Sequence, residues 1–127
     1  MAERIVAQRM IQQLHAARVG GDLAGVCRVF SDDGRFEILG ASADKSIALR
    51  AKDLAEFRPW LAMMVKVFRI SNYDLLTLIV EGSRATAHWR ADIYSKVTGV
   101  TVLTELVDVV QMNDERIVTY TEFFAPR

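Results

Sequence analysis

The chain has little of several residue types, and each shortage excludes a class of site. Its 127 residues include one cysteine, Cys27, so an internal disulfide and a cysteine-based metal cage are both impossible. Its two histidines and scattered acids do not match the spacing of a zinc site. No glycine-rich loop follows a predicted strand, so no nucleotide site is indicated. We therefore expect neither a metal nor a cofactor.

Neither sign of charge is in excess. Sixteen Lys and Arg residues balance sixteen Asp and Glu residues, whereas nucleic acid or an anionic membrane surface calls for a clustered basic excess. No apolar run approaches the roughly 20 residues of a membrane span, and the first charges come too early for a signal peptide. We expect a cytoplasmic protein that binds neither nucleic acid nor membrane.

What the chain does have is enough apolar material for one core. Hydrophobic residues make up 51% of it, so residues 1–127 are predicted to form a single domain. Apolar periodicity and turn signals predict helices first and long strands afterwards. The expected helices are 3–18, 23–30 (after Asp22 as N-cap) and 51–69 (kinked or restarted at Pro59); a turn at 31–34 precedes a strand at 35–39, a loop fills 40–50, and strands follow at 73–81, 84–95, 100–112 and 116–124.

This order of elements predicts an α+β fold in which helices pack on one face of a curved antiparallel sheet. Long strands twist strongly, so the sheet curls into a half-barrel. Helices across its mouth would then enclose a cone-shaped pocket, and such a hollow is where a small-molecule site is expected.

Residues 86–94 carry the strongest chemical signal. Even positions include His88, Arg90 and Asp92, whereas odd positions, such as Trp89, are apolar. Successive strand residues point to opposite faces, so one face of this strand is apolar and the other is polar. On a surface strand the polar row would face water; inside a cavity it would be a candidate chemical site.

Several segments resemble nuclear-transport-factor-2-like (NTF2-like) domains, in particular the SnoaL-like branch. They are Gly21–Gly25, Val29–Asp33, Val80–Ala85, His88–Ala91 ahead of Thr98-Gly99, and Arg116–Phe124. The resemblance covers nearly the whole chain and implies a cone-shaped NTF2-like fold. That superfamily contains cyclases, isomerases, dehydratases and epoxide hydrolases beside non-catalytic modules, so the fold does not fix the function.

A partial similarity to limonene-epoxide hydrolases adds site residues. Arg90-Ala-Asp92 stands where that family has Arg-x-Asp, and Glu122 stands where it has a second acid. The resemblance implies one carboxylate that takes a proton from water, one that protonates the epoxide, and an arginine that holds both. The family also anchors its water with Tyr and Asn, but Phe36 and Ile38 occupy those places and cannot hold a water.

If Arg90 and Asp92 face the hollow, as the resemblance implies, the two-residue alternation of side chains along a strand tells which residues of the other strands share that face. A turn near residues 96–100 would place His88 opposite Asp108, although a slip of one residue moves a whole strand to the other face. The candidate catalytic residues are Asp92, Arg90, Glu122, Asp108 and His88; the candidate substrate-binding residues are Phe36, Ile38, Trp60, Phe68, Tyr94, Thr104, Leu106, Tyr120 and Phe124.

Two kinds of function remain open. One is a cofactor-free acid/base enzyme (isomerase, cyclase, dehydratase or hydrolase) acting on a small apolar molecule that carries oxygen; the other is a ligand-binding or dimerisation module whose charges form a structural network. His15 is expected to be solvated. The opposite sheet face, with Trp89, Ala91, Ile93, Leu103, Val107 and Val109, is expected to form a homodimer interface. The case for chemistry at the polar row requires that Arg90 point inward.

Overall fold

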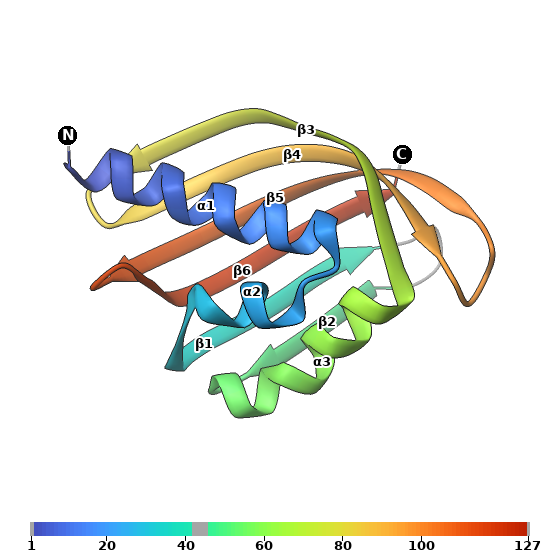
Figure 1. Ribbon diagram of the computed structural model, residues 1–127, viewed down its shortest axis with the longest axis horizontal. Coiled ribbons are helices and arrows are strands. Elements are labelled where there is room, and N and C mark those ends of the chain that lie inside the picture. Colours follow the sequence, from blue (N-terminus) through green and yellow to red (C-terminus); the bar gives the residue numbers. More distant parts are fainter. Residues whose placement is uncertain (1, 42–45, 127) are drawn as a thin grey trace.

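The structure, a computed structural model, describes residues 2–41 and 46–126. Three helices and six strands lie within these ranges (Figure 1). In chain order they are α1 (Ala2–Gly20), α2 (Leu23–Arg28), β1 (Phe30–Ala41), β2 (Ser46–Ala51), α3 (Leu54–Val67), β3 (Phe68–Glu81), β4 (Arg84–Ser95), β5 (Thr101–Asn113) and β6 (Arg116–Pro126).

The strands form one mixed sheet in the order β2-β1-β6-β5-β4-β3. The predicted antiparallel meander is confirmed for β3 through β6, whereas β1 pairs with β6 in parallel. Two local predictions are wrong. The expected turn at 31–34 lies within β1, where the register shifts between Phe30 and Arg35. The expected loop at 40–50 contains β2, apart from residues 42–45, which lie outside the described residues.

The helix ends follow from local side-chain chemistry. The Asp22 carboxylate accepts a hydrogen bond of 3.0 Å from the Gly25 backbone amide and caps α2. Asp53 does the same for α3 at 2.8 Å from the Glu56 amide. Of the two outcomes predicted at Pro59, a kink or a restart, the restart is wrong, because α3 runs through this residue from Leu54 to Val67.

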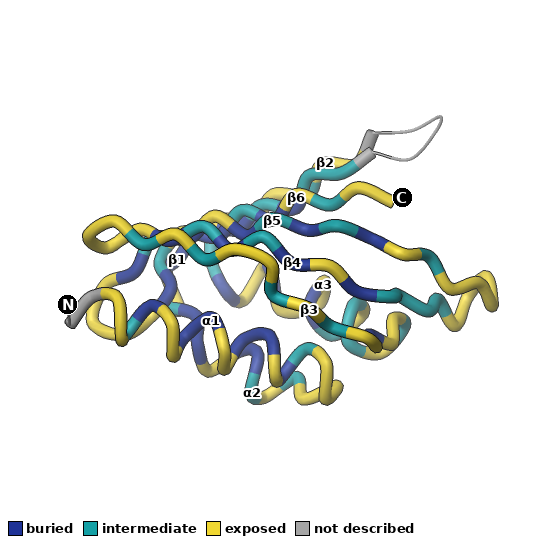
Figure 2. Tube along the Cα trace, turned by 90° about the horizontal axis from the view of Figure 1, so that it is seen from above, coloured by how far each residue is buried: buried dark blue, intermediate teal, exposed yellow. Residues whose placement is uncertain are grey.

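All three helices lie on the same side of the curved sheet (Figures 1 and 2). Register shifts in the β3–β4 pairing fall between Ser71 and Asp74 and between Leu75 and Thr77. Such bulges bend a strand and increase its twist. The largest fully buried side chains include Trp89, Phe30, Phe36 and Phe57, and they fill the space between the concave face and the helices. The fold is therefore the predicted cone-shaped α+β arrangement.

The predicted orientation of β4 is wrong. His88 pairs with Val107 rather than Asp108, a register one residue away from the expected one. The odd positions of β4 therefore face the interior, where Trp89 is fully buried, and Arg90 is exposed. Burying an indole and small apolar groups is favourable, whereas burying an unpaired charge costs several kcal/mol. The row of His88, Arg90 and Asp92 consequently lies on the convex face.

None of the described helices is long and apolar enough to span a membrane.

Candidate functional site

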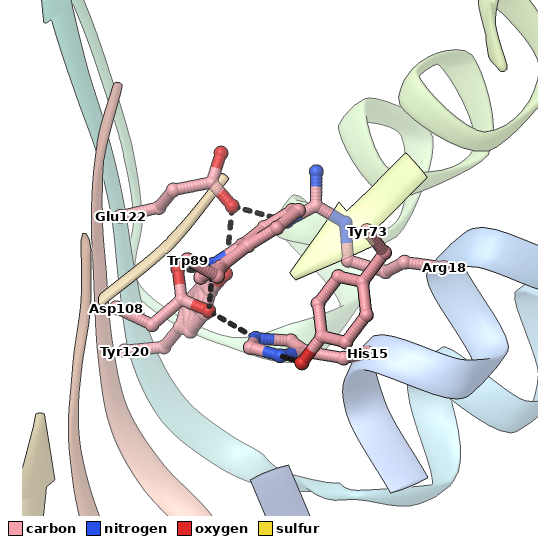
Figure 3. A network of polar contacts seen from close by, with 7 residues as sticks. All are labelled: His15, Arg18, Tyr73, Trp89, Asp108, Tyr120 and Glu122. Carbon is pink, nitrogen blue, oxygen red and sulfur yellow. Dashed lines mark hydrogen bonds and ion pairs between the residues drawn. The ribbon is translucent and has the colours of Figure 1, made fainter. Parts of the chain in front are cut away.

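Asp108 on β5 is the centre of a buried polar cluster between the sheet and α1 (Figure 3). Its Oδ2 accepts a hydrogen bond of 3.0 Å from the Trp89 indole N–H and lies 2.7 Å from His15 Nε2. Its Oδ1 lies 3.1 Å from the Tyr120 hydroxyl. A carboxylate accepts several hydrogen bonds at once, so Asp108 joins α1, β4 and β6 at one point.

Glu122 on β6 is the second buried acid of the cluster. Arg18 Nη1 and the Tyr120 hydroxyl both donate to its Oε1, the latter at 2.8 Å. The Arg18 guanidinium also lies 5.3 Å from the centre of the Trp89 ring, where a cation is attracted to the ring face. In Figure 3 the other oxygen of Glu122, Oε2, has no hydrogen bond among the described residues. One oxygen of this carboxyl is thus held, and the other is available.

The hydroxyl of Tyr120 has one hydrogen and two carboxyl groups within reach. It lies 3.1 Å from Asp108 Oδ1 and 2.8 Å from Glu122 Oε1. One hydrogen cannot serve both acceptors at the same time. The hydroxyl therefore donates its hydrogen to one of the two carboxyl groups at a time. The two acids compete for this donor.

The electrostatics of the cluster raise the pKa of Glu122. Burial is the largest cause and raises the pKa of the Glu122 carboxyl; the charge of Arg18 opposes this, and the charge of Asp108 adds to it, so that the pKa stays above its ordinary value of 4.5. Burial alone would lower the pKa of Arg18, but Glu122 raises it above its ordinary value. Arg18 thus stays charged, and Glu122 takes up a proton more readily than an exposed glutamate.

His15 extends the cluster toward the edge of the sheet. Its Nδ1 lies 2.6 Å from the Tyr73 hydroxyl on β3, and its Nε2 lies 2.7 Å from Asp108. Burial, together with the charges of Asp108 and Asp74, raises the pKa of Tyr73 to about 12. Tyr73, His15, Asp108, Tyr120 and Glu122 therefore form a continuous chain of polar contacts, which begins at a half-buried tyrosine.

A pocket of about 330 Å³ adjoins this cluster at Glu122 and Arg18. Its wall is largely apolar, and α3, β3, β4, β5 and β6 all contribute to it. This volume lies near the lower end of the range for small-molecule sites, roughly 300–1,000 Å³. The lining residues are Arg18, Ile38, Ile47, Leu49, Met63, Met64, Val65, Phe68, Ile70, Ile93, Ser95, Thr98, Val100, Val102, Thr104, Leu106, Glu122, Phe124 and Pro126.

Several predicted pocket residues lie together at this site. Ile38, Phe68, Thr104, Leu106 and Phe124 line the pocket. The two acids predicted on β5 and β6 lie on the concave face as expected: Glu122 borders the pocket, and Asp108 lies behind it. Tyr120 is buried between them.

Other predicted substrate-binding residues lie elsewhere. Phe36 is in the core, where its ring stacks on Phe57 with centroids 4.6 Å apart. Trp60 is exposed on α3 and does not line the pocket. Tyr94 lies on the convex side of β4, beneath the Arg69 guanidinium.

The polar row of β4 has its own surface partners on the convex face. His88 lies 3.9 Å from Glu105, Arg90 lies 3.6 Å from Asp74, and Asp92 accepts a hydrogen bond of 2.7 Å from Asn72. The prediction that these three residues line the pocket is wrong, and with it the case for chemistry at this row. Within the described parts of the chain, no group of three His, Cys, Asp or Glu residues is placed to hold a metal.

Sequence reasoning missed the two α1 residues of the cluster. His15 was expected in solvent but is 1% exposed, and Arg18 was not considered. A helical signal was present, because His15 follows Ile11 by four residues and Arg18 follows Leu14 by four. Ile11 and Leu14 are both buried, so the helix face that carries them also carries the side chains of His15 and Arg18.

By its fold, the chain is one of the small α+β domains in which a curved sheet and helices enclose a pocket. Residues 11–120 match the SnoaL-like domain family, and the chain belongs to this family. No curated protein matches the sequence.

Solved structures share the fold at low sequence identity. A Bacillus subtilis protein described as a proposed isomerase is 18% identical, with a TM-score of 0.82 over 98% of this chain and 89% of that one. An LEH-like epoxide hydrolase from M. tuberculosis is 14% identical, with a TM-score of 0.71 over 94% and 83%. A protein from Catenulispora acidiphila with a ketosteroid isomerase-like fold is 12% identical, with a TM-score of 0.73 over 91% and 85%. These likenesses establish the NTF2-like fold alone.

Proposed function

We propose that the protein is a cofactor-free acid/base enzyme that acts on a small, largely apolar molecule carrying oxygen. The observation that carries the proposal is a buried carboxyl, Glu122, that borders an apolar pocket with one oxygen unbonded among the described residues. A carboxyl with a raised pKa exchanges protons near neutral pH more effectively than an ordinary one. Isomerisation, cyclisation, dehydration and hydrolysis all need such a proton carrier.

In this proposal the carboxyl of Glu122 touches the substrate, and its neighbours set its protonation. As an acid, Glu122 donates its proton to a substrate oxygen; as a carboxylate, it removes a proton from carbon or water. Arg18 and Tyr120 hold Oε1 and thereby fix the direction of Oε2. Asp108 keeps Tyr120 and His15 in place and does not line the pocket.

A second candidate function is ligand binding without turnover. It is favoured by the completeness of the polar cluster, because every side-chain nitrogen and oxygen atom of the described residues that is itself shielded from solvent has a hydrogen-bond partner. A fully satisfied network also stabilises a fold without performing chemistry. The two candidates differ in whether Glu122 is needed for turnover or only for binding.

The test is proton transfer measured by NMR in deuterated buffer. The probes are cyclohexene oxide for hydrolysis, and 3-cyclohexenone for isomerisation and exchange at the carbon beside the carbonyl. We expect turnover of at least one probe by the wild-type protein and a loss of about 10²–10⁴-fold in Glu122→Gln, as for removal of a general acid or base. The control Asp92→Asn, on the convex face, should keep wild-type turnover.

Two outcomes would decide against catalysis. Equal rates in the wild type and in Glu122→Gln would remove the role of this carboxyl. Binding of the probes, seen as shifts in Leu106 and Phe124 resonances, without any turnover would favour the binding protein.

We also propose a homodimer through the convex face of the sheet. Trp89 and Ala91 are buried beneath the helices and Ile93 lines the pocket, so these three do not contribute to that face, which corrects the set expected from the sequence. Leu103, Val109 and Phe123 remain on it, with 43%, 40% and 44% of their surfaces exposed. Exposed apolar side chains of neighbouring strands β5 and β6 are typical of an interface.

A further inference from the structure

A second cavity lies beside the pocket, and all of its charged lining residues are cationic. This groove, of about 630 Å³, lies between the C-terminal ends of α1 and α3 and the start of β3. The residues that line it are Arg18, Val19, Gly20, Gly21, Leu23, Ala62, Val65, Lys66, Phe68, Arg69 and Lys96. Four of them are cationic, and no Asp or Glu is among the described residues lining the groove. The chain as a whole has zero formal charge, so this local excess has to be explained.

Stabilisation of the helix ends accounts for only part of the positive charge. Lys66 stands in the last turn of α3 and Arg18 in the last turn of α1, where cations balance roughly half an elementary charge of each helix dipole. Arg18 is also paired with Glu122, which neutralises it while that carboxyl is ionised. Lys96 and Arg69 are not on a helix. Within the described residues, no ion pair involves Lys66, Arg69 or Lys96. About two positive charges therefore remain unbalanced after both helix ends are counted.

Arg69 contributes less directly than the lysines to the positive charge of the groove. Its guanidinium lies over the Tyr94 ring at 5.9 Å, on the convex side of the sheet edge. The Lys96 backbone amide, in contrast, donates a hydrogen bond of 2.9 Å to the Val67 carbonyl. This bond fixes the end of β4 against the end of α3, so Lys66 and Lys96 belong to segments that are held together.

The groove and the apolar pocket adjoin each other. Arg18, Val65 and Phe68 line both of them. A ligand with an apolar body in the pocket can therefore place a polar end at the groove. The pocket offers an apolar wall and the groove offers positive charge without a competing acid, which is the complement of an amphiphilic anion.

We propose that the groove binds an anionic group, a carboxylate or a phosphate, of a ligand whose apolar part occupies the pocket. This inference deepens the proposed function and rests on it, because it names the substrate class of the same pocket. Lys66 and Lys96 are the residues that select the anion.

The experiment compares four probes with one apolar chain and different ends: octanoate, octyl phosphate, 1-octanol and octylamine. Dissociation constants are measured by NMR titration at low and at physiological ionic strength. We expect the anions to bind about tenfold tighter than 1-octanol, a difference of about 1.4 kcal/mol, and octylamine to bind most weakly. Added salt should reduce this preference, since the lysines are exposed. The two anionic probes tell whether a carboxylate or a phosphate fits better.

A double variant and a matched control make the test specific. Lys66→Gln/Lys96→Gln should lose the tenfold preference while keeping the wild-type affinity for 1-octanol. Lys52 is an exposed lysine just before the N-terminal end of α3, and Lys52→Gln should keep the preference. Equal affinity for octanoate and 1-octanol in the wild type, or an unchanged preference in the double variant, would overturn the inference. If 1-octanol binds without any anion preference, or if no octyl probe binds, this inference fails. The proposed function fails separately, when neither cyclohexene oxide nor 3-cyclohexenone is turned over.

Discussion

The indole N–H of Trp89 donates a hydrogen bond of 3.0 Å to Asp108 Oδ2 in the interior of the protein. The two residues lie on neighbouring strands, and both are fully buried. This single contact fixes which face of β4 points inward, because Trp89 and Arg90 are consecutive and must point in opposite directions. It also separates Asp108, inside the cone, from Asp92, which accepts a hydrogen bond from Asn72 on the convex face.

Asp108 is expected to contribute strongly to stability. Removing one member of a buried, hydrogen-bonded polar group leaves its partners unpaired, and His15, Trp89 and Tyr120 would all lose an acceptor in Asp108→Ala. We expect the free energy of unfolding to fall by about 3–5 kcal/mol, measured by urea denaturation.

Asp92→Ala is the matched control on the convex face, where the carboxylate has a surface partner in Asn72. Its effect should stay within about 1 kcal/mol, as is usual for surface polar pairs. Equal losses in the two variants would contradict the assignment of Asp108 as the centre of the network.

The pH dependence of stability should report the raised pKa of Glu122. Because the folded protein binds this proton more tightly than the unfolded chain, the contribution of Glu122 is fully present below pH 4.5 and is lost as the pH rises through the folded-state pKa. Each unit of difference in pKa corresponds to about 1.4 kcal/mol. Wild-type stability should therefore fall, relative to Glu122→Gln, as the pH is raised from 4.5 to neutrality.

The measurement is a series of urea unfolding curves for both proteins across that range. Titrating groups other than Glu122 are common to the two proteins, so they cancel to first order in the difference. Parallel pH profiles would show that the carboxyl has its ordinary pKa in the folded state, and the proposed acid would then be lost.

The sequence predicted the fold well because the fold depends on patterns that each extend over many residues. Helix periodicity in residues 3–18 and the three turns between the last four strands were enough to define the layers. Asp108 was placed on the correct face because two errors cancelled: the orientation of β4 was reversed, and its expected register against β5 was off by one residue. Tyr120 and Glu122 were placed correctly on the pocket side of β6.

The site was predicted only in part because orientation depends on a shift of one residue. In residues 86–94 the alternation alone favours a buried apolar face, with Trp89 inside, and the structure has that arrangement. The two-residue likeness Arg90-x-Asp92 favoured the opposite face, and it was wrong. Two matching residues carry less information than nine alternating ones. His15 and Arg18 of the cluster come from α1; the helical spacing shows that they share the buried face, but it does not show which strand residues they contact.

Gly40 is expected to control the shape of the pocket. A Cβ added at Gly40 would lie under 3.0 Å from three ring carbons of Phe124, its neighbour on β6. The ring would have to move, and Phe124 lines the pocket. Gly40→Ala should lower the free energy of unfolding by about 1–3 kcal/mol, as overpacking does, and weaken binding of 1-octanol.

Gly20→Ala serves as the comparison, because a Cβ there meets no atom within 4 Å. Thermal denaturation and the ring resonances of Phe124 are the two measurements. Unchanged Phe124 resonances in Gly40→Ala would mean that the ring does not rest against this glycine in solution.

The convex face is expected to hold two copies of the chain together. Val109 on β5 and Phe123 on β6 are exposed apolar residues of this face, and introducing a charge there would be unfavourable in a buried interface. Sedimentation at micromolar concentration should show a dimer for the wild type and a monomer for Val109→Lys and Phe123→Lys. Ile5→Lys, at an exposed position on α1, should remain dimeric because that helix lies on the other side of the sheet. A wild-type monomer under these conditions would exclude the dimer and leave the apolar convex face as a surface for a different protein.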